Sequence, residues 1–188
     1  PGTSGCLFWL LQLLGHQNVR VLNGRNRKWL SEGRQVANEF SHYEATDYPV
    51  LPVDDSLRAF YPEVRGAMDN SEQVLLDVRT IQEYSGEVFL MKPPEEDERG
   101  GHIPGAVHVD QLSMLAEDGT LKSFDELRTL YSSYGVTPDK LVIPYCAIGA
   151  RAGNVWFVLK YLLGYPNVRN YDGSWNEWSR QPSALVEP

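Results

Sequence analysis

Residues 141–151 and the apolar run that follows them constrain the fold of this chain more than any other stretch. Residues 141–143 (Leu-Val-Ile) are β-prone without a break, which is typical of a strand buried on both faces of a parallel sheet. Residues 153–163 carry Lys160 as their only charge, which predicts a largely buried helix. The stretch therefore predicts a strand, a tight loop that opens at Cys146, and a helix of an α/β fold.

Cys146 follows the end of the predicted strand and lies just before the helix N-terminus. Unpaired backbone N–H groups and the helix dipole favour thiolate over thiol there, which makes the sulfur a usable nucleophile. The same N–H groups can cradle an anion, Gly149 permits a close turn, and Arg151 adds a permanent cation. A buried structural cysteine is the alternative interpretation, because that is the commonest state of a free thiol.

Further short motifs lie in a fixed order between Asp54 and Ser179. They are LLDVR at 75–79, QEY at 82–84, RGGHIPGA at 99–106, CAIGAR at 146–151 and NYDGSW at 170–175. Together they resemble the rhodanese (thiosulfate sulfurtransferase) family, in its tandem-domain type.

The resemblance implies an α/β domain whose central, mostly parallel five-stranded sheet is flanked by helices on both faces. It also implies that Cys146 is the catalytic residue and carries a sulfane sulfur as a persulfide. The sulfur would pass from a small anionic donor, thiosulfate or a similar compound, to cyanide or a thiol. The residues expected to bind the donor are Arg79, Ala147, Ile148, Gly149, Ala150 and Arg151. No metal and no cofactor are expected.

The position of Arg79 in the sequence also favours a role in donor binding. It follows the predicted strand 73–78, and ligands of open parallel sheets bind beyond the carboxyl ends of the strands. If this strand neighbours the one that ends at Tyr145, Arg79 and Cys146 face the same crevice. A salt bridge to Asp77 or Glu83 is the structural alternative for Arg79.

Two other functions compete with sulfur transfer. Phosphatases and arsenate reductases of a related fold place five residues between cysteine and arginine, whereas four separate Cys146 from Arg151. A sulfur-carrier or binding module without turnover is the second alternative. Ala147 and Ile148 also differ from the basic residues common in members that use thiosulfate, so we expect weaker thiosulfate binding here.

Composition excludes several classes of protein. The formal net charge of −8 and the lack of a basic stripe argue against nucleic-acid binding. No apolar run approaches the ~20 residues of a membrane span, so no membrane partner is expected. Two cysteines give neither a disulfide framework nor a zinc pattern. We expect a cytoplasmic protein.

Residues 7–30 repeat residues 156–179 at a shift of 149 positions. Identical pairs include Gly15 and Gly164, Asn18 and Asn167, Val19 and Val168, Gly24 and Gly173, and Trp29 and Trp178. This indicates internal duplication. We therefore interpret residues 1–36 as the C-terminal remnant of a first, non-catalytic rhodanese domain whose N-terminal portion is missing.

Residues 37–52 are expected to form a linker, with Phe40, Tyr43 and Tyr48 packed on domain surfaces. Residues 53–188 are then the catalytic domain. Cys6 aligns with Val155 and not with Cys146, so it is expected to be a small residue that faces the core.

Overall fold

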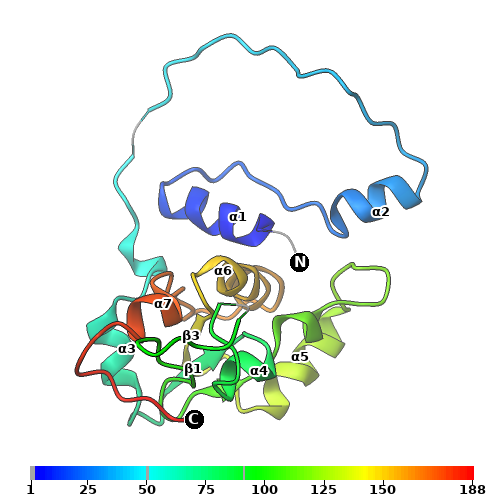
Figure 1. Ribbon diagram of the computed structural model, residues 1–188. Coiled ribbons are helices and arrows are strands. Elements are labelled where there is room, and N and C mark those ends of the chain that lie inside the picture. Colours follow the sequence, from blue (N-terminus) through cyan, green and yellow to red (C-terminus); the bar gives the residue numbers. More distant parts are fainter. Residues whose placement is uncertain (1–2, 50, 91) are drawn as a thin grey trace.

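The computed structural model describes residues 3–49, 51–90 and 92–188, and a parallel three-stranded sheet lies at its centre (Figure 1). β1 (Gln73–Asp77) lies between β2 (Val107–His108) and β3 (Leu141–Tyr145). The register of β1 and β3 runs from Gln73 opposite Leu141 to Asp77 opposite Tyr145. The predicted neighbourhood of these two strands is confirmed, and their carboxyl ends share one edge.

The expectation of five strands is wrong for the described part of the chain, where the sheet has three. Two more segments continue it only through single parallel bridges, Val142 with Val168 and Arg58 with Asn170. Pro144 of β3 supplies the physical reason for the first of these two single bridges. It has no N–H to donate to the segment beside it, so the ladder that begins at Val142 is interrupted.

Helices cover both faces of the sheet (Figure 1). One core lies between the sheet and α3 and α7, and the other between the sheet and α1, α5 and α6. Successive residues of β1 point to opposite faces of the sheet. Leu75 packs in the core with α3 and α7, and Leu76 packs in the core with α1, α5 and α6. The helices are α1 (Ser4–Leu13), α2 (Arg25–Ser31), α3 (Tyr61–Ala67), α4 (Ile81–Tyr84), α5 (Phe124–Ser133), α6 (Ala150–Phe157) and α7 (Ser174–Trp178). Short 3-10 turns at Asp55–Leu57 and Gln111–Met114 and a π-helical stretch at Val158–Leu162 complete the elements.

Local sequence signals explain where several of these helices begin. Ser123 and Glu126 form a capping box in which each bonds the other's backbone N–H, and α5 starts directly after it. Pro62 occupies the first turn of α3, where its missing N–H has no intrahelical acceptor. None of the helices in the described part of the chain is long and apolar enough to cross a membrane.

The N-terminal helix α1 lies along α6 (Figure 1), and its contacts follow the repeat shift. The rings of Phe8 and Phe157 meet at 4.9 Å between centroids, and Tyr161 donates to Gln12 Oε1 at 3.0 Å. Both pairs join residues 149 positions apart. The contacts thus pair positions that the repeat shift aligns, while the duplication and the division of the chain at residues 36 and 52 stay predictions.

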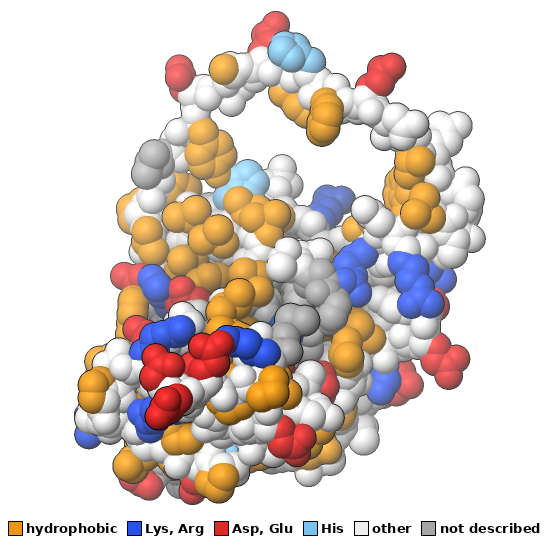
Figure 2. Space-filling model, in the orientation of Figure 1, with side chains coloured by type: hydrophobic (Ala, Val, Ile, Leu, Met, Phe, Trp, Pro, Cys, Tyr) orange, Lys and Arg blue, Asp and Glu red, His pale blue; other side chains and the backbone are white. Residues whose placement is uncertain are grey.

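The segment between α2 and the 3-10 turn at Asp55–Leu57 arches away from the body of the molecule, and Figure 2 shows its hydrophobic side chains uncovered. Phe40 is 102% exposed and Tyr43 82% exposed. The expectation that these rings pack on domain surfaces is wrong. Tyr48 differs from them, since its ring contacts that of His16 at 5.6 Å between centroids.

Candidate active site

The loop that begins at Cys146 joins the end of β3 to the start of α6. Gly149 is the N-cap of α6 and has a φ of 81°, in the left-handed region that glycine tolerates best. A Cβ on Gly149 would lie 2.6 Å from the carbonyl oxygen of Asp172. Glycine is therefore required here both by the turn and by the close approach of the segment before α7.

Helix α7 holds the loop by its backbone. Trp175 N–H donates to the carbonyl oxygen of Cys146 and Asn176 N–H donates to that of Ala147, each at 2.9 Å. In return, Cys146 N–H donates to Ser174 Oγ at 3.0 Å. Ser174 has a φ of 54°, a conformation that costs a non-glycine residue about 1–2 kcal/mol, and its hydroxyl holds the start of the loop.

These bonds occupy loop carbonyl oxygens and leave loop N–H groups available. The N–H groups of residues 147–152 donate to no acceptor within the described part of the chain. Ala150, Arg151 and Ala152 belong to the first turn of α6, whose N–H groups have no intrahelical acceptor. The loop thus offers an anion several donors and the positive end of a helix dipole.

The loop residues differ sharply in exposure. Cys146 is 1% exposed, and Ala147 and Gly149 are buried. Ala150 and Arg151 are half-buried, whereas Ile148 is 63% exposed. Cys146 therefore lies beneath the surface, and Ile148 is the loop side chain that solvent reaches most.

Arg151 is fixed by Glu83, a residue that sequence reasoning did not assign to the site. Arg151 Nη1 and Nη2 donate to the two carboxylate oxygens of Glu83, each at 2.6 Å. Glu83 is 4% exposed and is itself held by Thr80, whose N–H donates to it at 3.0 Å. The signal in the sequence was the Thr80-x-x-Glu83 capping box at α4; its link to the loop was not visible.

The pairing of Arg151 with Glu83 favours the charged form of both groups. Burial acts to lower the pKa of Arg151, but the hydrogen bond and charge of Glu83, with a smaller contribution from Cys146, raise it. Burial acts to raise the pKa of Glu83, and the bonds from Arg151 and Thr80 lower it. Both groups stay ionised, so a guanidinium remains beside Cys146.

Arg79 lies at the same edge of the sheet but is buried. Its Nε and Nη2 donate to the Asp77 carboxylate at 2.6–3.0 Å, and Nη2 also donates to the carbonyl oxygen of Gly101 at 2.7 Å. The guanidinium lies over the Trp175 ring, 4.7 Å from its centroid, and Arg79 is 1% exposed. Asp77 is therefore its salt-bridge partner. These contacts support a structural role, and donor binding by Arg79 stays a prediction.

Comparison with known proteins is consistent with this site. A family model described as "Rhodanese-like domain" matches residues 61–181, which include Arg79, Glu83 and the Cys146 loop. The chain is 45% identical over 176 residues to the sulfur carrier protein TtuD of Thermus thermophilus, covering 91% of this chain and 62% of that protein. It is 42% identical over 184 residues to a thiosulfate sulfurtransferase of Corynebacterium glutamicum, covering 96% of this chain and 60% of that protein.

A solved structure is similar along nearly the whole chain. It is an anaerobic ergothioneine biosynthesis enzyme from Chlorobium limicola, with a TM-score of 0.86 and 27% identity over 97% of this chain and 44% of that one. The chain therefore spans less than two thirds of the length of each of these relatives.

Proposed function

Because this chain belongs to the rhodanese-like domain family, we propose that it is a sulfurtransferase in which Cys146 carries a sulfane sulfur as a persulfide. Thiosulfate, or a donor of the same kind, is the proposed substrate. The relatives named as thiosulfate sulfurtransferases support this assignment. A thiol, or cyanide in an assay, is the proposed acceptor.

One observation carries the proposal. Cys146 opens a loop whose N–H groups, from residue 147 to residue 152, have no acceptor in the described part of the chain, and Arg151 stands beside it. Such a cradle stabilises negative charge on a sulfur bound to Cys146 and on an anionic donor.

The chemistry balances without any further reactant. The Cys146 thiolate attacks the outer sulfur of thiosulfate, the S–S bond of thiosulfate breaks, and its electron pair leaves with sulfite. The persulfide anion then rests among the loop N–H groups. An acceptor thiolate or cyanide attacks the outer sulfur, and the electron pair of the second S–S bond returns to Cys146.

A sulfur carrier is the second candidate function, and the name of the Thermus relative favours it. The chemistry at Cys146 is the same in both cases. A carrier holds the persulfide until a partner accepts it, whereas a transferase turns over with small acceptors. The neutral Ala147 and Ile148 suit slow turnover, since within the loop Arg151 is the residue that supplies a permanent charge.

The test is intact mass and cyanide-detectable sulfur after incubation with thiosulfate, for the full chain and for Cys146→Ser. We expect a gain of one sulfur atom that cyanide removes and that the variant lacks. Turnover with thiosulfate and cyanide then separates transferase from carrier. If the chain gains no sulfur from thiosulfate, mercaptopyruvate or a polysulfide while hydrolysing aryl phosphates, the proposal fails in favour of the phosphatase alternative.

A further inference from the structure

Exposed aliphatic side chains follow all three strands at the carboxyl edge of the sheet. Ile81 follows β1, Leu112 follows β2 and Ile148 follows β3, and all three are exposed to solvent. Cys146, in contrast, is buried, so the surface around its loop decides which acceptors come close enough to take the sulfur. Exposed apolar side chains that gather at one place mark interaction surfaces.

The segments that carry Ile81 and Leu112 both lie against α6, the helix that follows the loop. Glu83 of α4 bonds Arg151 in the first turn of α6, at 2.6 Å. The 3-10 turn at Gln111–Met114 also contacts α6. The apolar residues after β1 and β2 therefore belong to segments that are held beside the catalytic loop.

The N-terminal part of the chain carries a charge opposite to that of the rest. Residues 1–36 contain five basic residues and one acidic residue, a net charge of +4, whereas the whole chain has a net charge of −8. Residues 37–188 therefore carry −12. Figure 2 shows Lys and Arg side chains gathered at α2. A local basic surface on an acidic chain attracts acidic molecules to that place in particular.

Two arginines of α2 have no acidic partner within the part of the chain that the structure describes. Lys28 is paired with Asp118 at 2.8 Å, but Arg25 and Arg27 form no ion pair there. Arg27 is exposed and Arg25 is half-buried. Both guanidinium groups can therefore pair with carboxylates of another molecule.

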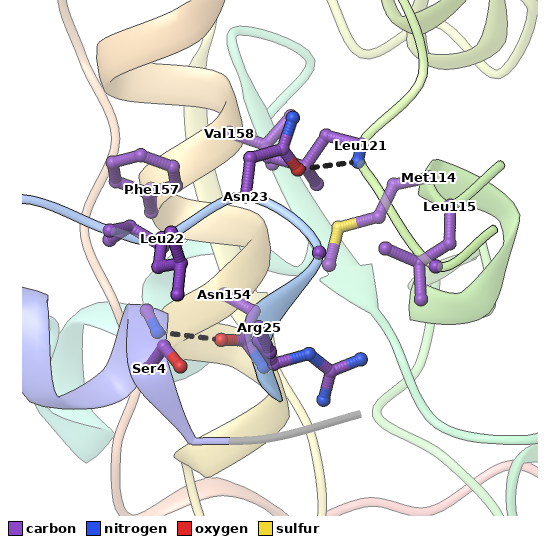
Figure 3. A pocket seen from close by; sticks show the side chains of 14 residues that line it. Ser4, Leu22, Asn23, Arg25, Met114, Leu115, Leu121, Asn154, Phe157 and Val158 are labelled. Carbon is purple, nitrogen blue, oxygen red and sulfur yellow. Dashed lines mark hydrogen bonds between the residues drawn. The ribbon is translucent and has the colours of Figure 1, made fainter. Parts of the chain in front are cut away.

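These two arginines meet the apolar residues in an open hollow. Arg25 and Arg27 line it together with Leu112 and Leu115. Arg25 also lines the small apolar cavity of Figure 3, whose wall includes Asn154 of α6. Asn154 lies about 6 Å along α6 from the first residue of that helix. Arg25 thus joins the hollow to the helix that starts at the catalytic loop.

We propose that Arg25, Arg27, Ile81, Leu112 and Ile148 form the docking site of a protein acceptor that carries acidic and apolar residues around its thiol. We call these five residues the acceptor face. The proposal rests on the persulfide function proposed above.

The composition of the acceptor face fits a protein better than a nucleic acid. Protein interfaces combine apolar side chains with arginine, as this face does. A nucleic acid would also meet the strongly acidic remainder of the chain. The face leaves the chemistry unchanged: the acceptor thiolate attacks the outer sulfur, and the electron pair of the broken S–S bond returns to Cys146.

The experiment measures sulfur transfer from the full chain, loaded at Cys146 and freed of donor, to two short synthetic peptides. Each peptide has one cysteine between two leucines, flanked by glutamates in one peptide and by lysines in the other. At low salt we expect transfer to the acidic peptide to be at least about tenfold faster, as electrostatic steering predicts. The difference should nearly vanish near 1 M salt, where the screening length is about 3 Å.

Arg27→Glu and Arg20→Glu are a matched pair of variants. Both residues are exposed, and each substitution makes the same change of charge on the same segment, but Arg20 is not among the described residues that line the hollow. Arg27→Glu should slow transfer to the acidic peptide several-fold, and Arg20→Glu much less. Both variants should keep the wild-type rate with 2-mercaptoethanol, a small neutral acceptor. Equal rates for the two peptides, or equal losses in the two variants, would overturn the acceptor face.

A binding measurement keeps this proposal separate from the proposed function. The acidic peptide, with serine in place of cysteine and a fluorescent label, is titrated with the unloaded chain. If Cys146 gains no sulfur but the peptide binds in a manner that depends on Arg27, the persulfide function fails and the docking surface stands. If a single-stranded oligonucleotide of equal charge binds more tightly and also depends on Arg27, the surface serves a nucleic acid and the protein acceptor is wrong.

Discussion

Two arginine–carboxylate pairs lie at the carboxyl edge of the sheet, one at the end of β1 and one at the start of α6. Arg79 bonds a partner two residues away, and its side chain is 2% exposed. Arg151 bonds Glu83, 68 residues away, and its side chain is 26% exposed. The sequence presents both arginines as donor-binding candidates, with a salt bridge as the alternative for Arg79, and the structure shows that they differ in burial and in the sequence distance to their partners.

This difference indicates that the two arginines have different roles, one in the stability of the sheet edge and the other in the proposed reaction. Arg79 fills the space between Asp77, Gly101 and the Trp175 ring, and so joins β1 to two distant segments of the fold. Arg151 is held by Glu83, interacts with Cys146, and has a side chain that is still 26% exposed, so it can also reach the proposed donor. Loss of Arg79 should therefore act on stability, and loss of Arg151 on catalysis.

The largest expected effect is on folding, from Arg79→Ala. The variant leaves the fully buried Asp77 carboxylate without its cation, and breaking a buried pair from one side costs about 3–5 kcal/mol. Urea unfolding of the full chain should show this loss of free energy. Arg79→Lys is the matched control, since it keeps the charge but loses the two-point contact. A stable Arg79→Ala protein with a much higher KM for thiosulfate would instead show that Arg79 binds the donor, so that the two arginines would not differ in role.

Arg151→Ala should cost nearly as much, but in catalysis. Removing one preorganised donor from an anion site typically lowers the rate about 10²–10³-fold. We expect kcat/KM for thiosulfate to fall by that order, while the urea midpoint changes less than in Arg79→Ala. Arg151→Lys should recover part of the activity, because it restores the positive charge but not the pair of hydrogen bonds that the guanidinium makes. If Arg151→Ala unfolds as readily as Arg79→Ala does, the two pairs have the same role.

Glu83→Gln should have an intermediate effect, because Glu83 acts through Arg151. The variant keeps the shape and removes the charge that holds the guanidinium, and hydrogen bonds to charged groups are worth about 1.5–3 kcal/mol. We expect kcat/KM to fall at least tenfold, but less than in Arg151→Ala. In the double variant the effects should not add, as expected for residues that act as a unit. Additive losses would show that Glu83 acts on catalysis independently of Arg151.

The same pair sets a pH dependence of stability. The pKa of Glu83 is lowered in the folded protein relative to its ordinary value of about 4.3. The pair therefore contributes its full stability above this value and loses it as the pH falls through the lower, folded pKa. Between pH 5 and pH 3 the melting temperature of the wild type should fall more than that of Glu83→Gln. Parallel curves would contradict the pairing.

Local signals in the sequence were sufficient for the centre of this site. The run 141–143, Gly149 and the apolar helix placed the strand, the loop and the Cys146 position, since each signal acts within a few residues. The position of Pro62 in the first turn of α3 and the capping box of Ser123 and Glu126 at the start of α5 depend on equally local signals.

The features that the sequence did not predict depend on contacts between segments that lie far apart in the sequence. The capping box marked Glu83 as a residue of α4, but nothing local indicates that its carboxylate also meets Arg151. The half-buried state of Cys6 likewise follows from how α1 lies on α6. The predicted number of strands was too high in part because Pro144 interrupts the ladder between β3 and the segment at Val168, which hydrophobic patterning alone would continue.

The smallest expected effect is a gain, from Ile148→Lys. Ile148 is 63% exposed, so a lysine there adds a solvated charge at the mouth of the loop, in contrast to the held charge of Arg151. Two unit charges at about 4 Å in water interact by about 1 kcal/mol, so the KM for thiosulfate should fall about fivefold at low salt. Ile148→Gln is the control of similar length without charge. The gain should vanish near 1 M salt, where the screening length is about 3 Å. If Lys and Gln variants have equal KM at low salt, the donor does not pass within reach of residue 148, and the neutral loop gives no reason to expect weaker thiosulfate binding.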